Sequence, residues 1–307
     1  MPTDWADMST GQLEAGRHEF VVDGVRQAYH VAGQGPVCVA HPGGPGLDWA
    51  YLRSAELEKR FTVVYLEPVG TGGSGRLDPS DYGLATYVRY LAAVVDHLGE
   101  RRVHLLGHSH GGFVVQKYAL AYPDRVAGLI LYSTSPESGP EFWAAAMAGL
   151  AAYPQRHPDE PEAVAVPTAF QRALAAEDDE TLSLAFAAAI PVYFADFWPH
   201  QEEFTPFQAS IRMWREPAVA QDPVPFDVRP HLHELAVPVV VVVGRQDFIC
   251  GPRWAQMLVD GIAGARMRVL EQSGHFGHVE QPAEFGAAVA AVLTDRAPVE
   301  GEGGVAT

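Results

Sequence analysis

The chain has 307 residues, of which 48% are hydrophobic, so it can bury a large core. This length fits one large domain, or one domain that carries an inserted subdomain. With 21 basic and 38 acidic residues, the formal net charge is -17. Such a charge repels phosphate backbones and anionic lipids, which argues against nucleic acids and membranes as partners.

Residues 1–20 are acidic and lack the apolar stretch of a signal peptide, and no run approaches the length of a membrane span. We therefore expect a cytoplasmic protein. The two cysteines, Cys38 and Cys250, do not make a disulfide framework. Cys38 lies in an apolar run and is expected to be buried, whereas Cys250 lies close to Asp247 in the sequence.

Short apolar runs alternate with helical patterns over the first 132 residues. Buried strands separated by helices are typical of a mainly parallel sheet that is covered on both faces. Strands are predicted at residues 19–31 (two, around Asp23-Gly24), 37–40, 61–66, 102–106 and 126–132, and helices at 47–59, 86–98 and 113–122.

This alternation stops at about residue 133. The segment 135–230 contains no comparable strand and is rich in proline and aromatic residues, so we predict an inserted, mostly helical cap. The α/β core would then comprise residues 1–134 and 231–297, and residues 298–307 would form a disordered tail. Helices are predicted in the cap at 143–151 and 180–189; beyond it, strands are predicted at 237–243 and 265–270 and helices at 252–261 and 282–293.

Residues 107–111 read Gly-His-Ser-His-Gly, between a predicted strand and a predicted helix. This spacing and context are typical of a nucleophile elbow, a strained turn that exposes its central serine to a substrate. Gly107 and Gly111 fit it, because a Cβ at either position would clash with the tightly turned backbone. Ser109 needs a base and an orienting acid, since a serine hydroxyl is a weak nucleophile. Without such partners the motif would equally fit an ordinary turn.

Two polar residues supply these partners. Asp247 follows the strand predicted at 237–243, and His275 follows the strand predicted at 265–270. Parallel strands bring their carboxyl ends to one edge of a sheet, and the chain order Ser, Asp, His is that of α/β-hydrolases. We predict that Ser109 attacks, that His275 lies in hydrogen-bond reach of it as the base, and that Asp247 orients the imidazole. His278 is the alternative base.

An acyl-transfer site also needs N–H donors for a developing oxyanion. The N–H of His110, directly after the nucleophile, is one candidate, and Gly44 in the loop 42–46 is the other, preferred over Gly43. The Gly-rich loop 67–76 lacks the Gly-Lys-Ser/Thr of a phosphate loop and is predicted to be structural. We expect no metal site, because the pair His231 and His233 is more typical of ordinary surface residues.

These motifs resemble those of α/β-hydrolase-fold serine hydrolases, and among them the proline iminopeptidases of peptidase family S33. The resemblance spans residues 20–295 and implies the α/β-hydrolase fold, a Ser-His-Asp triad and catalysis without a cofactor. The motifs that carry it are Gly43-Gly44-Pro45-Gly46 after His41, Gly107-His108-Ser109-His110-Gly111-Gly112, Gly244-Arg245-Gln246-Asp247 with Cys250 nearby, and Ser273-Gly274-His275.

The chain also departs from that family. Its elbow carries His108 and His110 where the family commonly has Gly and Trp, and Pro42 interrupts the family's His-Gly-Gly-Pro-Gly. The cap glutamates that hold a free amine in iminopeptidases have no counterpart in the expected motifs. Glu202 or Glu203 would have to take their place, so we expect neutral substrates to be preferred.

We therefore predict a cofactor-independent serine hydrolase that cleaves a small ester, lactone or amide through an acyl-enzyme. The alternatives are a proline iminopeptidase that releases N-terminal proline, and a non-catalytic small-molecule-binding protein on the same fold. The expected partner is a small molecule or short peptide. The sequence leaves open whether the chain forms a homo-oligomer. Most cap aromatics are expected to pack the cap. The candidates for substrate binding are Trp143, Tyr193, Phe194, Phe197 and Trp198.

Overall fold

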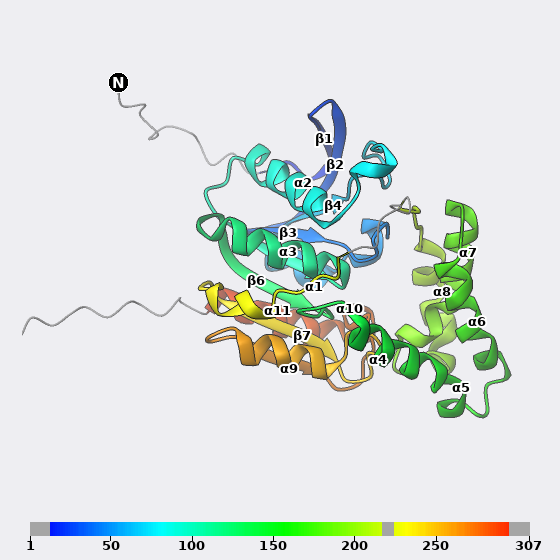
Figure 1. Ribbon diagram of the computed structural model, residues 1–307. Coiled ribbons are helices and arrows are strands. Elements are labelled where there is room, and N and C mark those ends of the chain that lie inside the picture. Colours follow the sequence, from blue (N-terminus) through cyan, green and yellow to red (C-terminus); the bar gives the residue numbers. More distant parts are fainter. Residues whose placement is uncertain (1–12, 217–223, 295–307) are drawn as a thin grey trace, which may run out of the picture.

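The computed structural model describes residues 13–216 and 224–294. Within them, eight strands form one sheet in the order β1-β2-β4-β3-β5-β6-β7-β8 (Figure 1). The pairs β1–β2 and β2–β4 are antiparallel and all the others are parallel. The strands are β1 Gly16–Val22, β2 Val25–Gly33, β3 Val37–His41, β4 Thr62–Glu67, β5 Val103–His108, β6 Val126–Tyr132, β7 Val239–Gly244 and β8 Arg266–Leu270.

Helices cover both faces of this sheet, which confirms the predicted architecture. Alternate residues of β4 show why: Val63 and Tyr65 belong to one buried cluster, and Val64 and Leu66 belong to another. The second cluster includes α2, α3 and α9, and the first includes α1, α11 and the cap. Together with the short α10, these core helices are α1 Ala55–Glu58, α2 Leu84–His97, α3 His110–Ala121, α9 Pro252–Gly261, α10 Gly277–Glu280 and α11 Pro282–Thr294.

The chain between β6 and β7 contains helices and no strand in its described part. These helices stand together to the right of the sheet in Figure 1. Division of the chain at residues 135 and 230 stays a prediction, and the predicted tail, residues 298–307, lies outside the described residues. The helices of this cap are α4 Pro140–Ala151, α5 Tyr153–Arg156, α6 Val166–Leu174, α7 Asp179–Ala189 and α8 Gln201–Ser210.

The continuous helix predicted over residues 47–59 is wrong. The structure has a 3-10 helix at Trp49–Leu52 and then α1, with a break at Ser54. The backbone of Ser54 is extended, and its hydroxyl accepts a hydrogen bond from the N–H of Leu57 as the N-cap of α1. A serine that caps a new helix cannot continue the preceding one, because its own backbone is non-helical.

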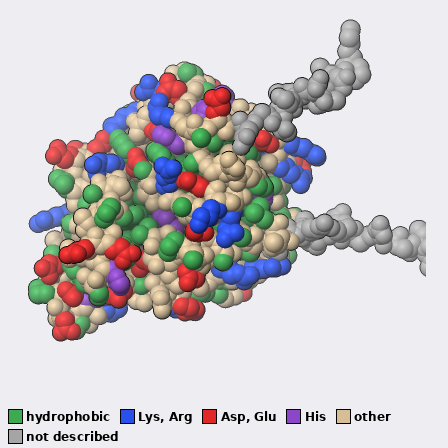
Figure 2. All heavy atoms as spheres, turned by 180° about the vertical axis from the view of Figure 1, so that it is seen from behind, with side chains coloured by type: hydrophobic (Ala, Val, Ile, Leu, Met, Phe, Trp, Pro, Cys, Tyr) green, Lys and Arg blue, Asp and Glu red, His purple; other side chains and the backbone are tan. Residues whose placement is uncertain are grey.

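Acidic and basic side chains are interspersed over the face shown in Figure 2. The net charge is therefore spread over that face and does not form one acidic surface. No single helix of the described residues is long and apolar enough to cross a membrane; one bent pair, Asp179–Tyr193 with Trp198–Ser210, passes by length and composition only.

Candidate active site

The turn between β5 and α3 places Ser109 in a strained conformation, with φ at 54° and ψ at -122°. An added Cβ on Gly107 would lie 2.5 Å from the carbonyl oxygen of Gly111. That is closer than real Cβ atoms approach other atoms, so glycine is needed here, as the elbow motif predicts. The hydroxyl of Thr134 donates to the carbonyl oxygen of Ser109 at 2.7 Å and helps to fix the turn.

Asp247 and His275, far apart in sequence, form a buried pair. Oδ2 of Asp247 lies 2.7 Å from Nδ1 of His275. Burial by itself raises the pKa of Asp247, but His275 and the N–H groups of Cys250 and Ile249 hold that pKa below its usual value. The ionised carboxylate can only accept, so Nδ1 of His275 carries the proton. Nε2 is then free to act as a base.

Ser109 and His275 line one cavity of about 660 Å³. Cys250 also lines it, and its thiol lies near the Ser109 side chain. Burial raises the pKa of Cys250 well above its usual value, which makes it a neutral thiol and not a competing thiolate nucleophile. The expected contact between the Ser109 hydroxyl and His275 stays a prediction.

The loop after β3 brings candidate oxyanion donors to this cavity. The N–H of Gly43 donates to the hydroxyl of Tyr51 at 2.7 Å and is already used. Gly44 and His110 both line the cavity. No acceptor among the described residues is hydrogen-bonded to the N–H of either. Two free N–H groups at one cavity are what an oxyanion hole requires.

A buried chain of hydrogen bonds connects this loop to His275, and sequence reasoning missed it. The hydroxyl of Tyr51 lies 2.6 Å from Nδ1 of His108, and Nε2 of His108 lies 3.0 Å from the carbonyl oxygen of His275. A carbonyl can only accept, so Nε2 of His108 donates and Nδ1 accepts from Tyr51. Burial lowers the pKa of His108 well below its usual value, consistent with this neutral form. The only signal in the sequence for this chain of hydrogen bonds was His108, at a position where proline iminopeptidases commonly have glycine.

Two of the five aromatic candidates line the cavity, namely Trp143 and Tyr193. The rings of the other three pack elsewhere in the cap: Phe194 lies 4.3 Å from Phe204 by ring centroid, and Phe197 contacts both that ring and Trp198. Sequence alone could not separate wall residues from packing residues, because both are apolar. The candidates that the structure places outside the cavity wall are Phe194, Phe197 and Trp198.

The charged residues at this cavity also differ from expectation. Glu202 and Glu203 are exposed on α8 and do not line it. Arg215 and Glu216 do, and no motif signalled them. The hydroxyl of Tyr87 donates to Glu216 at 2.9 Å, and burial raises the pKa of the Glu216 carboxyl above its usual value.

The histidine pair considered as a metal site lies on a 3-10 helix, Arg229–Glu234, away from this cavity. His231 is hydrogen-bonded to Glu234 at 2.7 Å. In the part of the chain that the structure describes, no group of three or more His, Cys, Asp or Glu side chains is placed to hold a metal ion.

This fold and this site define a class of protein. The sequence matches the alpha/beta hydrolase fold family over residues 36–282, so the chain belongs to that family. The named relatives are hydrolases, and the protein is an enzyme of that class.

Two curated relatives and one solved structure illustrate its neighbours. The chain is 29% identical to 2-hydroxymuconate semialdehyde hydrolase of Pseudomonas sp. (strain CF600), over 92% of this chain and 95% of the relative. It is 26% identical to proline iminopeptidase of Lactobacillus crispatus (strain ST1), over 81% and 87%. A crystal structure of a hydrolase from Pseudomonas aeruginosa PA01 superposes with a TM-score of 0.66 and 25% identity, over 91% and 98%.

Proposed function

We propose that the protein is a cofactor-independent serine hydrolase that cleaves a small ester, lactone or amide through an acyl-enzyme. The observation that carries the proposal is the 2.7 Å hydrogen bond between Asp247 and His275, at the wall of the cavity that also exposes Ser109 on its strained turn. A nucleophile, a base and an orienting acid in this arrangement are what acyl transfer needs.

In the proposed reaction, the Ser109 hydroxyl gives its proton to Nε2 of His275 as the oxygen attacks the substrate carbonyl carbon. The N–H groups of Gly44 and His110 hold the oxyanion that forms. The carbonyl re-forms as the leaving group departs with the proton from His275. Water then repeats the sequence on the acyl-enzyme and releases the acid.

The cavity supports a small, largely apolar substrate. Its wall is built mainly of cap aromatics and aliphatics, and burial of such surface favours apolar ligands. The Pseudomonas relative is named for a small molecule, which also supports a substrate of this size. The cap helices α4, α6 and α7, with the 3-10 helix that follows α7, contribute these apolar residues to the wall: Phe142, Trp143, Phe170, Leu174, Phe186 and Tyr193.

The second candidate is a proline iminopeptidase. Glu216 favours it, because a carboxylate in the cavity wall is a partner for a substrate's free amine. Its contact with Tyr87 weakens this role, since the Tyr87 hydroxyl already occupies part of the carboxyl that an ammonium would need. Neutral esters therefore remain the preferred substrates.

A substrate panel tests both candidates. We expect p-nitrophenyl acyl esters to be cleaved with a higher kcat/KM than proline p-nitroanilide, and a fluorophosphonate probe to label Ser109. The reverse preference would make the iminopeptidase function correct. An unlabelled Ser109, with no turnover of any ester or anilide, would instead favour a binding protein.

A further inference from the structure

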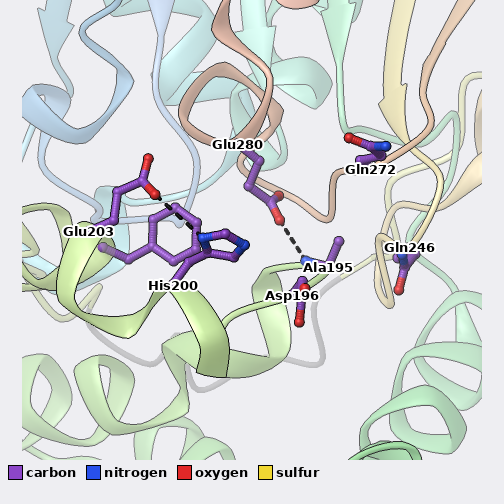
Figure 3. A pocket seen from close by; sticks show the side chains of 8 residues that line it. Ala195, Asp196, His200, Glu203, Gln246, Gln272 and Glu280 are labelled. Carbon is purple, nitrogen blue, oxygen red and sulfur yellow. Dashed lines mark hydrogen bonds and ion pairs between the residues drawn. The ribbon is translucent and has the colours of Figure 1, made fainter.

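A partly buried carboxylate joins the cap to the loop that carries His275. Glu280, at the end of α10, accepts the N–H of Ala195 with Oε1 at 2.7 Å and the N–H of Gly274 with Oε2 at 2.7 Å. Ala195 belongs to the cap and Gly274 precedes His275. Figure 3 shows the first of these bonds. One carboxyl group therefore spans the boundary between two parts of the molecule.

The same two segments also touch directly. The N–H of His275 donates to the carbonyl oxygen of Tyr193 at 2.6 Å, and the two rings lie 5.4 Å apart by centroid. An added Cβ on Gly274 would lie 2.3 Å from that same carbonyl oxygen. Only glycine allows so close an approach. The backbone of His275 is thus held by the cap as well as by its own loop.

We propose that Glu280 is a positioning residue that fastens the cap segment 193–196 to the His275 loop, so that the position of the cap and the placement of the His275 ring are coupled. The inference rests on the function proposed for Ser109 and His275. Glu280 itself does not line the cavity of Ser109, so it acts through the loop and not on a substrate.

The protonation state of Glu280 controls how many N–H groups it can hold. The ionised carboxylate accepts with both oxygens, whereas a protonated carboxyl turns one oxygen into a donor that opposes an N–H. Burial raises the pKa of Glu280 to about 7, and Asp247 adds to the shift. A polar cavity of about 600 Å³ gives protons access to Glu280 (Figure 3). The other titratable groups that line it, all from the cap, are Asp196, His200 and Glu203.

The test compares Glu280→Gln with Glu284→Gln, an exposed glutamate on α11, as the matched control. The amide keeps the size of the side chain but places an NH₂ group against one backbone N–H. We expect kcat for the preferred ester to fall about tenfold to a hundredfold, with KM little changed, because small misplacements of catalytic groups cost this much. Hydrogen exchange at the amides of Gly274 and Ala195 should become at least about tenfold faster.

The pH profile provides a readout that a merely structural role would not move. In the wild type, protonation of Glu280 adds to any other loss of activity at low pH, so the acidic limb of log kcat/KM should be steeper than in Glu280→Gln, which lacks this titrating group. Ala195→Pro removes one donated N–H and leaves the carboxyl intact, and we expect it to speed exchange at Gly274. The extended backbone of Phe194 suits a following proline.

Wild-type kcat and wild-type amide exchange in Glu280→Gln would overturn the proposal, as would a rise in KM alone. If Glu280→Gln does not fold, Ala195→Pro decides by the same exchange measurement. Failure of the proposed function looks different: no substrate would be turned over by the wild type, while amide exchange would still report the link between cap and loop.

Discussion

At the residue scale, the chemistry depends on where Ser109 sits. Its positive φ is a strained conformation for a residue other than glycine, and it persists because β5, α3 and the Thr134 hydroxyl hold both sides of the turn. The strained turn exposes Ser109 to the cavity, because its apex lies at the cavity wall and not within the sheet.

The first prediction concerns this serine. Ser109→Ala should lower kcat by about 10⁴-fold or more, because it removes the nucleophile and leaves only binding and the oxyanion donors. Turnover of the preferred p-nitrophenyl ester measures the loss, and circular dichroism checks that the fold is intact. More than a few per cent of residual activity in a clean preparation would contradict the assignment.

The second prediction concerns the pair Tyr51 and His108. Tyr51→Phe keeps the ring but removes the oxygen that accepts from Gly43 and donates to His108, and it leaves both buried partners unpaired. We expect a loss of about 1–3 kcal/mol in the free energy of unfolding, measured by urea titration. kcat should fall as well, because the oxyanion loop and the His275 loop lose their shared support. Tyr122→Phe, at a half-exposed tyrosine, is the control.

At the element scale, we expect the helices α4, α6 and α7 to shape the substrate range, because their side chains form much of the cavity wall. Trp143 on α4 and Leu174 on α6 both line the cavity, but they are 42% and 62% exposed to solvent. Exposed apolar side chains at a cavity margin favour ligands whose apolar part extends beyond the enclosed space.

A third prediction concerns the acyl-chain length of the substrate. Leu174→Ser should lower kcat/KM for p-nitrophenyl esters of long acyl chains more than for the acetate, because it removes apolar surface only at the margin. Leu184→Ser, at an exposed leucine that does not line the cavity, should leave that ratio unchanged. Equal effects of both variants, or an effect on the acetate alone, would count against a substrate path along α6.

The charged cavity residue Glu216 gives a fourth prediction, which separates the two candidate functions. If neutral esters are the substrates, Glu216→Gln should change kcat/KM for them by less than about threefold. A loss of a hundredfold or more for proline p-nitroanilide alone would show that this carboxylate binds an amine, since a charge-assisted contact is worth about that much. Glu202→Gln is the control, because Glu202 is exposed on α8.

At the scale of the whole molecule, buried neutral histidines should make stability depend on pH. Burial is the main cause that lowers the pKa of His41 to about 4, of His110 to about 3 and of His278 to about 4. In the unfolded chain these groups titrate near 6.5, so the unfolded state binds more protons between pH 6.5 and about 4. Their stabilising contribution is fully present above pH 6.5 and is lost as the pH falls.

The fifth prediction gives the size of this pH dependence of stability. Between pH 7 and pH 5, each of the three should remove about 2 kcal/mol from the free energy of unfolding. Glu280 acts in the opposite direction, because its folded pKa of about 7 lies above its usual value. Urea titrations at both pH values measure the sum. His110→Phe should reduce the difference by about 2 kcal/mol, and an unchanged difference would refute the role of His110.

Local pattern was enough for most of the fold. β6 and α9 begin and end where the apolar runs and the flanking proline predict, because a strand buried on both faces and a helix with proline in its first turn leave clear local signals. The elbow was predictable because its glycines and serine are contiguous, although only the steric demand on Gly107 acts within the turn. A Cβ on Gly111 would meet the carbonyl oxygen of His41, in a segment far away in the sequence.

What only the tertiary structure decided involves residues distant in sequence. The pattern of apolar residues could not tell Tyr193, in the cavity wall, from Phe194, in the cap interior, because both are large aromatic residues and the direction in which each ring points is set by tertiary packing. Nor could it show Glu280 between Ala195 and Gly274, since a hydrogen bond from a side chain to a distant backbone leaves no sequence motif. The sequence by itself therefore determined the strands, the elbow and the order of the candidate triad, and packing between distant segments decided the cavity wall and the contacts that hold His275.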